Sequence, residues 1–307
     1  MRHVDLSQIR RFVKQSVRDE ANNAQAFLTN ATTDSERRAY IGANGSKWTA
    51  FRDALWLIGF GKCWYSEAIL CAEEGEVEHF RPKQQVWRSN PVHGGYWWHA
   101  FDWQNFRLAH PLVNKRRRDY STEQQAGKGC YFPLRLESER AFTSPEEPRE
   151  CPTLLDPTVA RDCRLLCFDG SSGKPIPRYR LEDDPDGWRH LRAVESIGFY
   201  HLDNGTWNAQ REDLMHDVGV LCQRILEAFS THDTSSYEQL LDELASYIHP
   251  FAEFSSAAAQ AVREKGLLDH LSPLPSAPLV MELGVGQVTR ASADSNAFVP
   301  RMEGGQL

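Results

Sequence analysis

Residues 76–114 constrain this chain more than any other stretch, because they hold polar side chains of several chemical types in a fixed order. A carboxylate and an imidazole are adjacent, two asparagines follow, and the order is Glu78, His79, Asn105, Asn114. A run of four cations, Lys115–Arg118, comes next. Alone, an asparagine is usually a turn residue or a cap, and a charge run is usually a solvated surface. Their joint order and spacing predict a catalytic site.

These residue types are the ones that phosphodiester hydrolysis requires. The reaction needs an activated water, neutralisation of charge on the phosphate and help for the leaving oxygen, and one divalent ion supplies the last two. Mg²⁺ prefers oxygen ligands and keeps several waters, so the Glu78 carboxylate and the Asn114 amide oxygen suffice. An unperturbed histidine has a pKa of about 6.5, which makes His79 the candidate base. Neighbours on a strand point to opposite faces, so we expect a bend or loop at the pair.

The order Glu-His-Phe-Arg-Pro-Lys, then Trp-Gln-Asn-Phe, then Asn-Lys resembles the HNH (ββα-metal) nuclease finger, in the form whose third letter is Asn. The resemblance implies a metal-dependent endonuclease acting on DNA, with one Mg²⁺ or Mn²⁺ held by Glu78 and Asn114. It implies that His79 is the base and that Asn105 braces the loop that carries it. The same resemblance places two cations against the phosphate backbone, Lys115 and Arg117.

The segment Lys62–Glu67 narrows this resemblance. Its sequence, Lys-Cys-Trp-Tyr-Ser-Glu, is similar to a subgroup of HNH proteins that includes the PtuB-like nuclease subunits of Septu-type and retron-linked anti-phage systems. Members typically carry Cys-x-x-Cys here and again at the second Asn, and those four cysteines would hold a structural zinc. This chain keeps Cys63 but has Ser66, and His110 and Val113 stand at the second pair. Two ligands are too few for a closed site, so we expect no structural zinc.

Two segments after the finger also resemble the family, a Phe-Pro element at residues 131–134 and a Glu-x-Pro-x-Leu-Leu-x-Pro element at residues 150–157. By the same resemblance, such subunits work with an ABC/SMC-like ATPase in a hetero-oligomeric complex. The formal net charge of this chain is −7, so contact with DNA must come from local basic patches. An acidic chain of this kind fits a nuclease that borrows binding surface from a partner.

The hydrophobic pattern predicts an α+β protein, in which the finger is embedded in a mostly α-helical chain. Apolar residues at three- and four-residue spacing indicate helices over residues 5–29, 46–60, 214–229, 235–248 and 250–265, whereas residues 31–45 are polar and predicted as turns. The 26 positions from His79 to Asn105 are long for a compact finger. They predict a hairpin or loop insertion near residues 87–99, in which His93 and His99 are expected to be exposed.

We divide the chain into an N-terminal helical segment (1–60), a nuclease domain with insertions (61–170), a C-terminal helical domain (171–265) and a flexible tail (266–307). The tail is rich in Ser, Ala, Pro and Gly and has no sustained period. The N-terminus is polar, and no apolar stretch approaches the roughly 20 residues of a membrane helix, so we expect a cytoplasmic protein.

Two alternatives to the DNA nuclease stay open. The first is a non-catalytic adaptor with a degenerate finger, which the missing zinc cysteines motivate. The second is an RNA or tRNA nuclease on the same scaffold, because these residues do not separate DNA from RNA. Replacing His79 by alanine discriminates the adaptor from the enzyme, since only the enzyme loses an activity.

Overall fold

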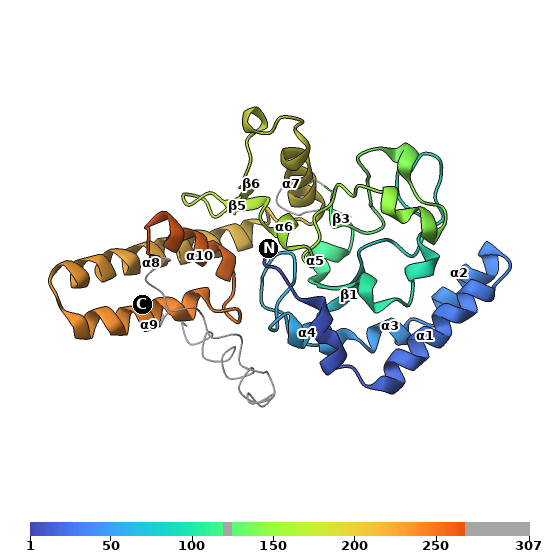
Figure 1. Cartoon of the computed structure of the whole chain (residues 1–307), viewed down its shortest axis with the longest axis horizontal. Coiled ribbons are helices and arrows are strands. Elements are labelled where there is room, and N and C mark those ends of the chain that lie inside the picture. Colours follow the sequence, from blue (N-terminus) through green and yellow to red (C-terminus); the bar gives the residue numbers. More distant parts are fainter. Residues whose placement is uncertain (119–124, 268–307) are drawn as a thin grey trace, which may run out of the picture. The chain divides into compact units, whose positions relative to one another are not determined.

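The computed structural model describes residues 1–118 and 125–267. Met1–Leu271 form one compact unit, and its described part combines many helices with small two-stranded antiparallel sheets (Figure 1). This confirms the predicted α+β class. The predicted flexible tail lies, apart from its first two residues, outside the described residues, and the division into domains stays a prediction. None of the described helices is long and apolar enough to cross a membrane.

The N-terminal part is helical, as predicted, but each predicted helix is divided in two. Residues 5–29 form the 3-10 helix η1 (Leu6–Arg11) and the helix α1 (Gln15–Asn30). Residues 46–60 form α3 (Ser46–Thr49) and α4 (Arg52–Ile58).

The turn predicted for residues 31–45 is wrong, because helix α2 spans Asp34–Ala43. The Thr33 hydroxyl caps it by accepting a hydrogen bond from the Glu36 amide at 3.2 Å. Only Ile41 of this helix is buried, so its apolar pattern is too sparse to show a period. Tyr40 fixes the helix against α1 by stacking on Phe27, with 3.9 Å between ring centroids.

A two-stranded sheet carries the predicted site. Strand β1 (Glu76–His79) pairs antiparallel with β2 (Phe106–Ala109), so that Glu78 lies opposite Arg107 and His79 opposite Phe106. The short helix α5 (Pro111–Asn114) follows β2 directly and starts with proline, whose missing N–H is no loss at that position. The order strand, strand, helix is the one that a ββα finger requires.

The connection between β1 and β2 folds as a loop with two 3-10 turns, η2 (Trp97–His99) and η3 (Trp103–Asn105). Of the two forms predicted for the insertion, a hairpin and a loop, the structure has the loop. Its apolar side chains pack with residues that follow the finger. We call this cluster the loop core, and its buried members are Phe80, Val86, Tyr96, Phe132 and Leu134, with Trp98 against them.

The expectation that His93 and His99 are exposed is wrong. His93 is buried, and its Nε2 lies 2.9 Å from the Ala141 carbonyl oxygen. His99 is half-buried, and its two ring nitrogens lie 2.9 Å from carboxylate oxygens of Asp102 and Glu147. Both contacts form because burial of the loop core brings the insertion against residues 141–150.

His99 should make the stability of the protein depend on pH. Burial opposes its positive charge, but hydrogen bonds to Asp102 and Glu147 outweigh burial and raise its pKa to about 9. The folded pKa lies above the unfolded value of about 6.5, so the stabilisation is complete below that pH and is lost as pH rises through 9. In urea denaturation, His99→Gln should therefore lower the free energy of unfolding more in mild acid than above pH 9. Equal losses in both conditions would show that His99 is uncharged in the folded protein.

The remaining described residues add two small sheets and a helical C-terminal part. Helix α8 (Gly205–Ser230) packs against both α9 (Thr234–Ile248) and α10 (Ser255–Glu264), and Figure 1 shows α8 and α9 side by side. Each coincides with a predicted helix, although α8 begins nine residues early, where Asn204 caps it. In chain order the elements are β3 (Arg117–Arg118), β4 (Gln125–Ala126), η4 (Glu137–Glu139), η5 (Ser144–Arg149), α6 (Ala160–Cys163), β5 (Leu166–Phe168), β6 (Pro175–Pro177), η6 (Leu181–Asp183), α7 (Trp188–Phe199), α8 (Gly205–Ser230), α9 (Thr234–Ile248) and α10 (Ser255–Glu264).

Candidate active site

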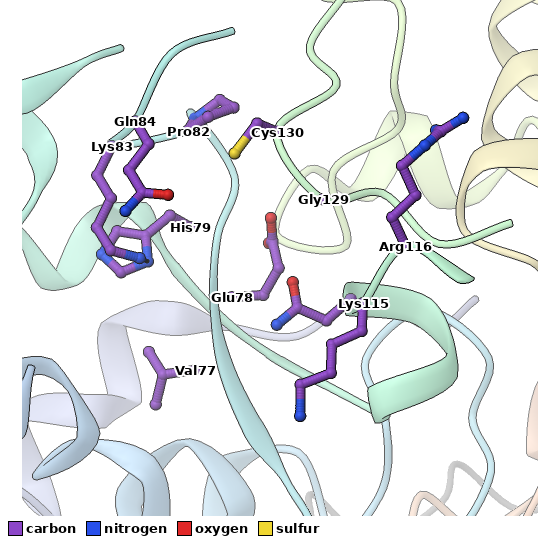
Figure 2. A pocket seen from close by; sticks show the side chains of 11 residues that line it. Val77, Glu78, His79, Pro82, Lys83, Gln84, Lys115, Arg116, Gly129 and Cys130 are labelled. Carbon is purple, nitrogen blue, oxygen red and sulfur yellow. Dashed lines mark hydrogen bonds between the residues drawn. The ribbon is translucent and has the colours of Figure 1, made fainter. Parts of the chain in front are cut away.

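A cavity of about 410 Å³ lies where β1 ends, and four of the six predicted site residues line it: Glu78, His79, Asn114 and Lys115. Figure 2 shows the His79 ring beside the Lys83 side chain, with Glu78 and Lys115 in the same view of the cavity. The expected bend is at Phe80, one residue after the Glu-His pair, where β1 stops. The chain turns there, and both members of the pair line one cavity.

His79 is held as a neutral imidazole with one defined basic nitrogen. Its Nε2 lies 2.9 Å from the Ala100 carbonyl oxygen, and because a carbonyl only accepts, Nε2 carries the proton. Nδ1 therefore has the free electron pair, and the Lys83 ammonium lies 3.2 Å from it. Burial, followed by the charges of Lys83 and Lys128, holds the pKa of His79 well below its usual value. The ring is uncharged at neutral pH, as a general base must be.

Asn105 lies outside the cavity and holds the loop behind the base. Its Oδ1 accepts a hydrogen bond from the Arg81 amide at 2.8 Å, and its Nδ2 donates to the Arg81 carbonyl at 2.9 Å. The Asn105 carbonyl also accepts a hydrogen bond from the Phe80 amide at 3.0 Å. These contacts hold the two residues that follow His79, and the predicted bracing role of Asn105 stays a prediction.

Glu78 is buried between two groups that the sequence analysis did not assign to the site. The Tyr65 hydroxyl donates to Oε2 at 2.7 Å, and the ammonium of Lys128, itself fully buried, lies 2.6 Å from Oε1. The same ammonium donates a hydrogen bond to the His79 carbonyl at 2.9 Å. Its contact with Oε1 is a buried ion pair. The Lys128 ammonium thus contacts both the Glu78 carboxylate and the His79 backbone at the end of β1.

Lys128 reaches the site because a glycine lets its loop approach α5. Gly127 has a φ of +95°, and a Cβ at this position would lie 2.0 Å from the Lys115 carbonyl oxygen. The next two amides donate to carbonyls of α5: Lys128 to Val113 and Gly129 to Asn114, both at 2.8 Å. No periodicity or motif marks this approach. Tyr65, in contrast, lies within the Lys62–Glu67 segment that carried the family resemblance.

Glu76 orients the two residues at the end of α5. Its Oε2 accepts a hydrogen bond from Asn114 Nδ2 at 2.9 Å, and its other oxygen pairs with the Lys115 ammonium. The Asn114 nitrogen is therefore engaged, which leaves its oxygen for a ligand. Arg117 is not brought into the cavity, because its guanidinium donates to the Pro111 carbonyl. Arg116 lines the cavity in its place.

The donor set fits a hard divalent cation. The Glu78 oxygen Oε1 contacts the Lys128 ammonium at 2.6 Å, so a metal ion at this oxygen would have to share it with that ammonium. The amide oxygen of Asn114 is the other candidate ligand on the same cavity. Carboxylate and amide oxygens are ligands that Mg²⁺ and Mn²⁺ accept.

The place where family members would hold a structural zinc is organised by hydrogen bonds in this chain. The Cys63 amide donates to the Ala68 carbonyl at 2.9 Å, and the Glu67 amide donates to the Cys63 carbonyl at 3.0 Å. His110 uses its Nδ1 to accept from the Leu112 amide at 3.0 Å. Across residues 1–118 and 125–267, no three His, Cys, Asp or Glu side chains are placed to hold a metal. The expected absence of a structural zinc stays a prediction.

The segment at residues 150–157 anchors the sheet and the base loop. Asp156 accepts two hydrogen bonds from Arg107, at 2.7 and 2.6 Å. Arg107 is the residue of β2 that lies opposite Glu78 in the sheet. Glu150 accepts from Arg81 at 2.9 Å, at the residue that Asn105 also holds. The two acids of the Glu-x-Pro-x-Leu-Leu-x-Pro element therefore position the site without lining it.

The fold and site define an α+β protein whose strand-strand-helix unit presents a histidine, a glutamate and an asparagine to one cavity. No protein-family model matches the chain. The chain is similar to Septu protein PtuB of Bacillus mycoides (strain KBAB4), with 34% identity over 176 residues. The match covers 56% of this chain and 52% of the relative, so the chain spans about half the length of the protein that it matches. The similarity confirms the predicted resemblance to PtuB-like Septu proteins, and the HNH assignment stays a prediction.

Proposed function

We propose that this protein is a metal-dependent HNH endonuclease that hydrolyses DNA phosphodiester bonds as the effector subunit of a Septu-type anti-phage defence system. The observation that supports the activity best is the single cavity lined by His79, Glu78 and Asn114, with Asn105 bonded to the loop behind the base. The likeness to Septu protein PtuB supports a place in a defence system. An ABC/SMC-like ATPase as partner rests on the family resemblance.

His79 begins the reaction through Nδ1. It takes a proton from a water, the resulting hydroxide forms a bond to phosphorus, and the bond from phosphorus to the leaving oxygen breaks. The leaving oxygen then takes a proton from solvent. Lys83 now points its ammonium at Nδ1, and a phosphodiester in the cavity gives that ammonium a stronger, anionic partner. Substrate binding therefore frees the base.

The other residues neutralise charge at the phosphate and hold the site in position. Glu78 and Asn114 would hold one Mg²⁺ or Mn²⁺, which when bound neutralises charge at the phosphate and the leaving oxygen. Lys128 keeps the Glu78 carboxylate next to the His79 backbone. Lys115 and Arg116 are exposed at the cavity and suit contact with the phosphate backbone, so Arg116 takes the role first assigned to Arg117.

Plasmid cleavage with Mg²⁺ or Mn²⁺ tests this function. EDTA should stop the wild-type protein, and Asn114→Ala should slow it by at least the roughly 10- to 100-fold that even outer-shell metal-site residues are worth. Asn22→Ala, an exposed asparagine on α1, is the matched control and should cleave normally. RNA of the same sequence is assayed in parallel, with and without the co-purifying ATPase and nucleotide.

Four outcomes contradict parts of this proposal. Cleavage that persists in EDTA would show that the reaction needs no metal. Cleavage of RNA but not of DNA would favour the RNA or tRNA nuclease. No cleavage of either nucleic acid, even with the ATPase and nucleotide present, supports the adaptor. Equal rates with and without the ATPase would refute its control of the nuclease.

A further inference from the structure

A second cavity, of about 120 Å³, adjoins the first. Its lining includes two arginines of helix α2, one lysine, and two tryptophans of the connection between β1 and β2. These residues are Arg37, Arg38, Lys83, Trp97 and Trp98. Lys83 lines both cavities. The ammonium of this shared residue lies 3.2 Å from Nδ1 of His79, the proposed base.

The charge in this second cavity is positive, although the whole chain is acidic. Its one acid, Asp34, pairs with Arg37 at 3.0 Å, which leaves Arg38 and Lys83 in excess. Arg38 is exposed, and it has no ion-pair or hydrogen-bond partner within the described residues. In a chain of net charge −7, two cations that have no acidic partner in the cavity attract an anion.

Each cavity also holds an arginine fixed on a tryptophan ring. Arg116 lines the first cavity and lies 3.8 Å from the ring centroid of Trp87. Arg37 lines the second cavity and lies 4.3 Å from the ring centroid of Trp97. A stacked guanidinium is restrained in position. Arg37 is held further by hydrogen bonds to the Leu28 and Ala31 carbonyls and to Asp34, so it shapes the cavity wall. Both rings belong to the insertion, so the insertion fixes one cation in each cavity.

We propose that the two cavities form one groove for a nucleic-acid strand, and that the second cavity takes the phosphate next to the cleaved bond. Arg38 and Lys83 contact that phosphate, and Arg37 on Trp97 forms the wall. The proposal rests on the nuclease function proposed above and adds where the strand lies. It also gives Lys83 a switching part: once its ammonium pairs with the flanking phosphate, Nδ1 of His79 is free to accept a proton.

Arg38→Ala tests the groove, because this exposed side chain can be removed without disturbing the core. Binding of a short fluorescent single-stranded DNA is measured by anisotropy at several salt concentrations, in a His79→Ala background that prevents cleavage. Arg38→Ala should weaken binding and lower the slope of log affinity against log salt by about 0.7–1, the value for one lost phosphate contact. Arg224→Ala, an exposed arginine on α8 that lines neither cavity, is the matched control and should change neither quantity.

The outcomes separate this inference from the function on which it rests. If the Arg38→Ala variant binds with the affinity and salt slope of its His79→Ala parent, the second cavity holds no phosphate and the groove is wrong. The nuclease proposal is then still decided by the plasmid cleavage assay. If the parent does not bind the strand at all, the groove is refuted, and plasmid cleavage by the wild type alone decides on the nuclease. The same strand as RNA is measured in parallel, because the backbone phosphates are common to both.

Discussion

His79→Ala should slow phosphodiester cleavage by about 10²–10⁴-fold, which is what a positioned general base contributes. The effect is large because the ring is already prepared for the reaction. The Ala100 carbonyl fixes the proton on Nε2, and burial with the charges of Lys83 and Lys128 lowers the pKa of His79. The base loses its function only when protonated, so the acidic limb of the wild-type rate profile should lie below the usual pKa of about 6.5. Single-turnover cleavage over a range of pH measures both quantities.

This prediction needs a control for folding, because His79 also packs against aromatic rings. Its ring centroid lies 5.4 Å from that of Trp48 and 5.0 Å from that of Phe106. His79→Gln keeps more of that volume and should be as inactive as His79→Ala, with thermal unfolding close to the wild type. His190→Ala, a histidine outside the site that bonds the Tyr179 carbonyl, should cleave normally. Full cleavage by folded His79→Ala would move the role of base to another residue.

Lys128→Met should lower the free energy of unfolding by about 3–5 kcal/mol, which is the loss expected when one partner of a buried ion pair is removed. The variant leaves the Glu78 carboxylate buried without its cation, and it also removes the hydrogen bond to the His79 carbonyl. Urea denaturation in EDTA measures the loss without a contribution from bound metal. Lys174→Met changes an exposed lysine and should stay within about 0.5 kcal/mol of the wild type.

The double variant Glu78→Gln/Lys128→Met identifies the cause of that loss. It removes both charges, so much of the stability lost in Lys128→Met should return, because no charge is left buried without a partner. An instability that stays the same in the double variant would assign the effect of Lys128 to its packing and its backbone hydrogen bond. A loss below about 1 kcal/mol in the single variant would show that Lys128 does not pair with Glu78 in solution.

The sequence was most informative where chemistry or periodicity is local. The order of polar residues predicted four of the cavity residues. The apolar spacing predicted a helix over residues 235–248, and the observed helix α9 starts only one residue earlier, at Thr234. It failed where a contact depends on distant parts of the chain. The cation beside Glu78 comes from 50 positions further on and depends on the positive φ of Gly127. Likewise His93 and His99 are covered only because the insertion folds onto residues 141–150.

The loop core has a consequence for how chains of this kind can diverge. Val86 and Tyr96 come from the connection between β1 and β2, and they pack with Phe132 and Leu134 from the segment after the finger. Deleting the insertion would empty that volume, and a cavity left by large apolar side chains is strongly destabilising. Among relatives, the length of the connection between the two strands should therefore covary with the side-chain sizes at positions 132 and 134. A lineage that shortened the insertion would have had to acquire compensating substitutions at those two positions.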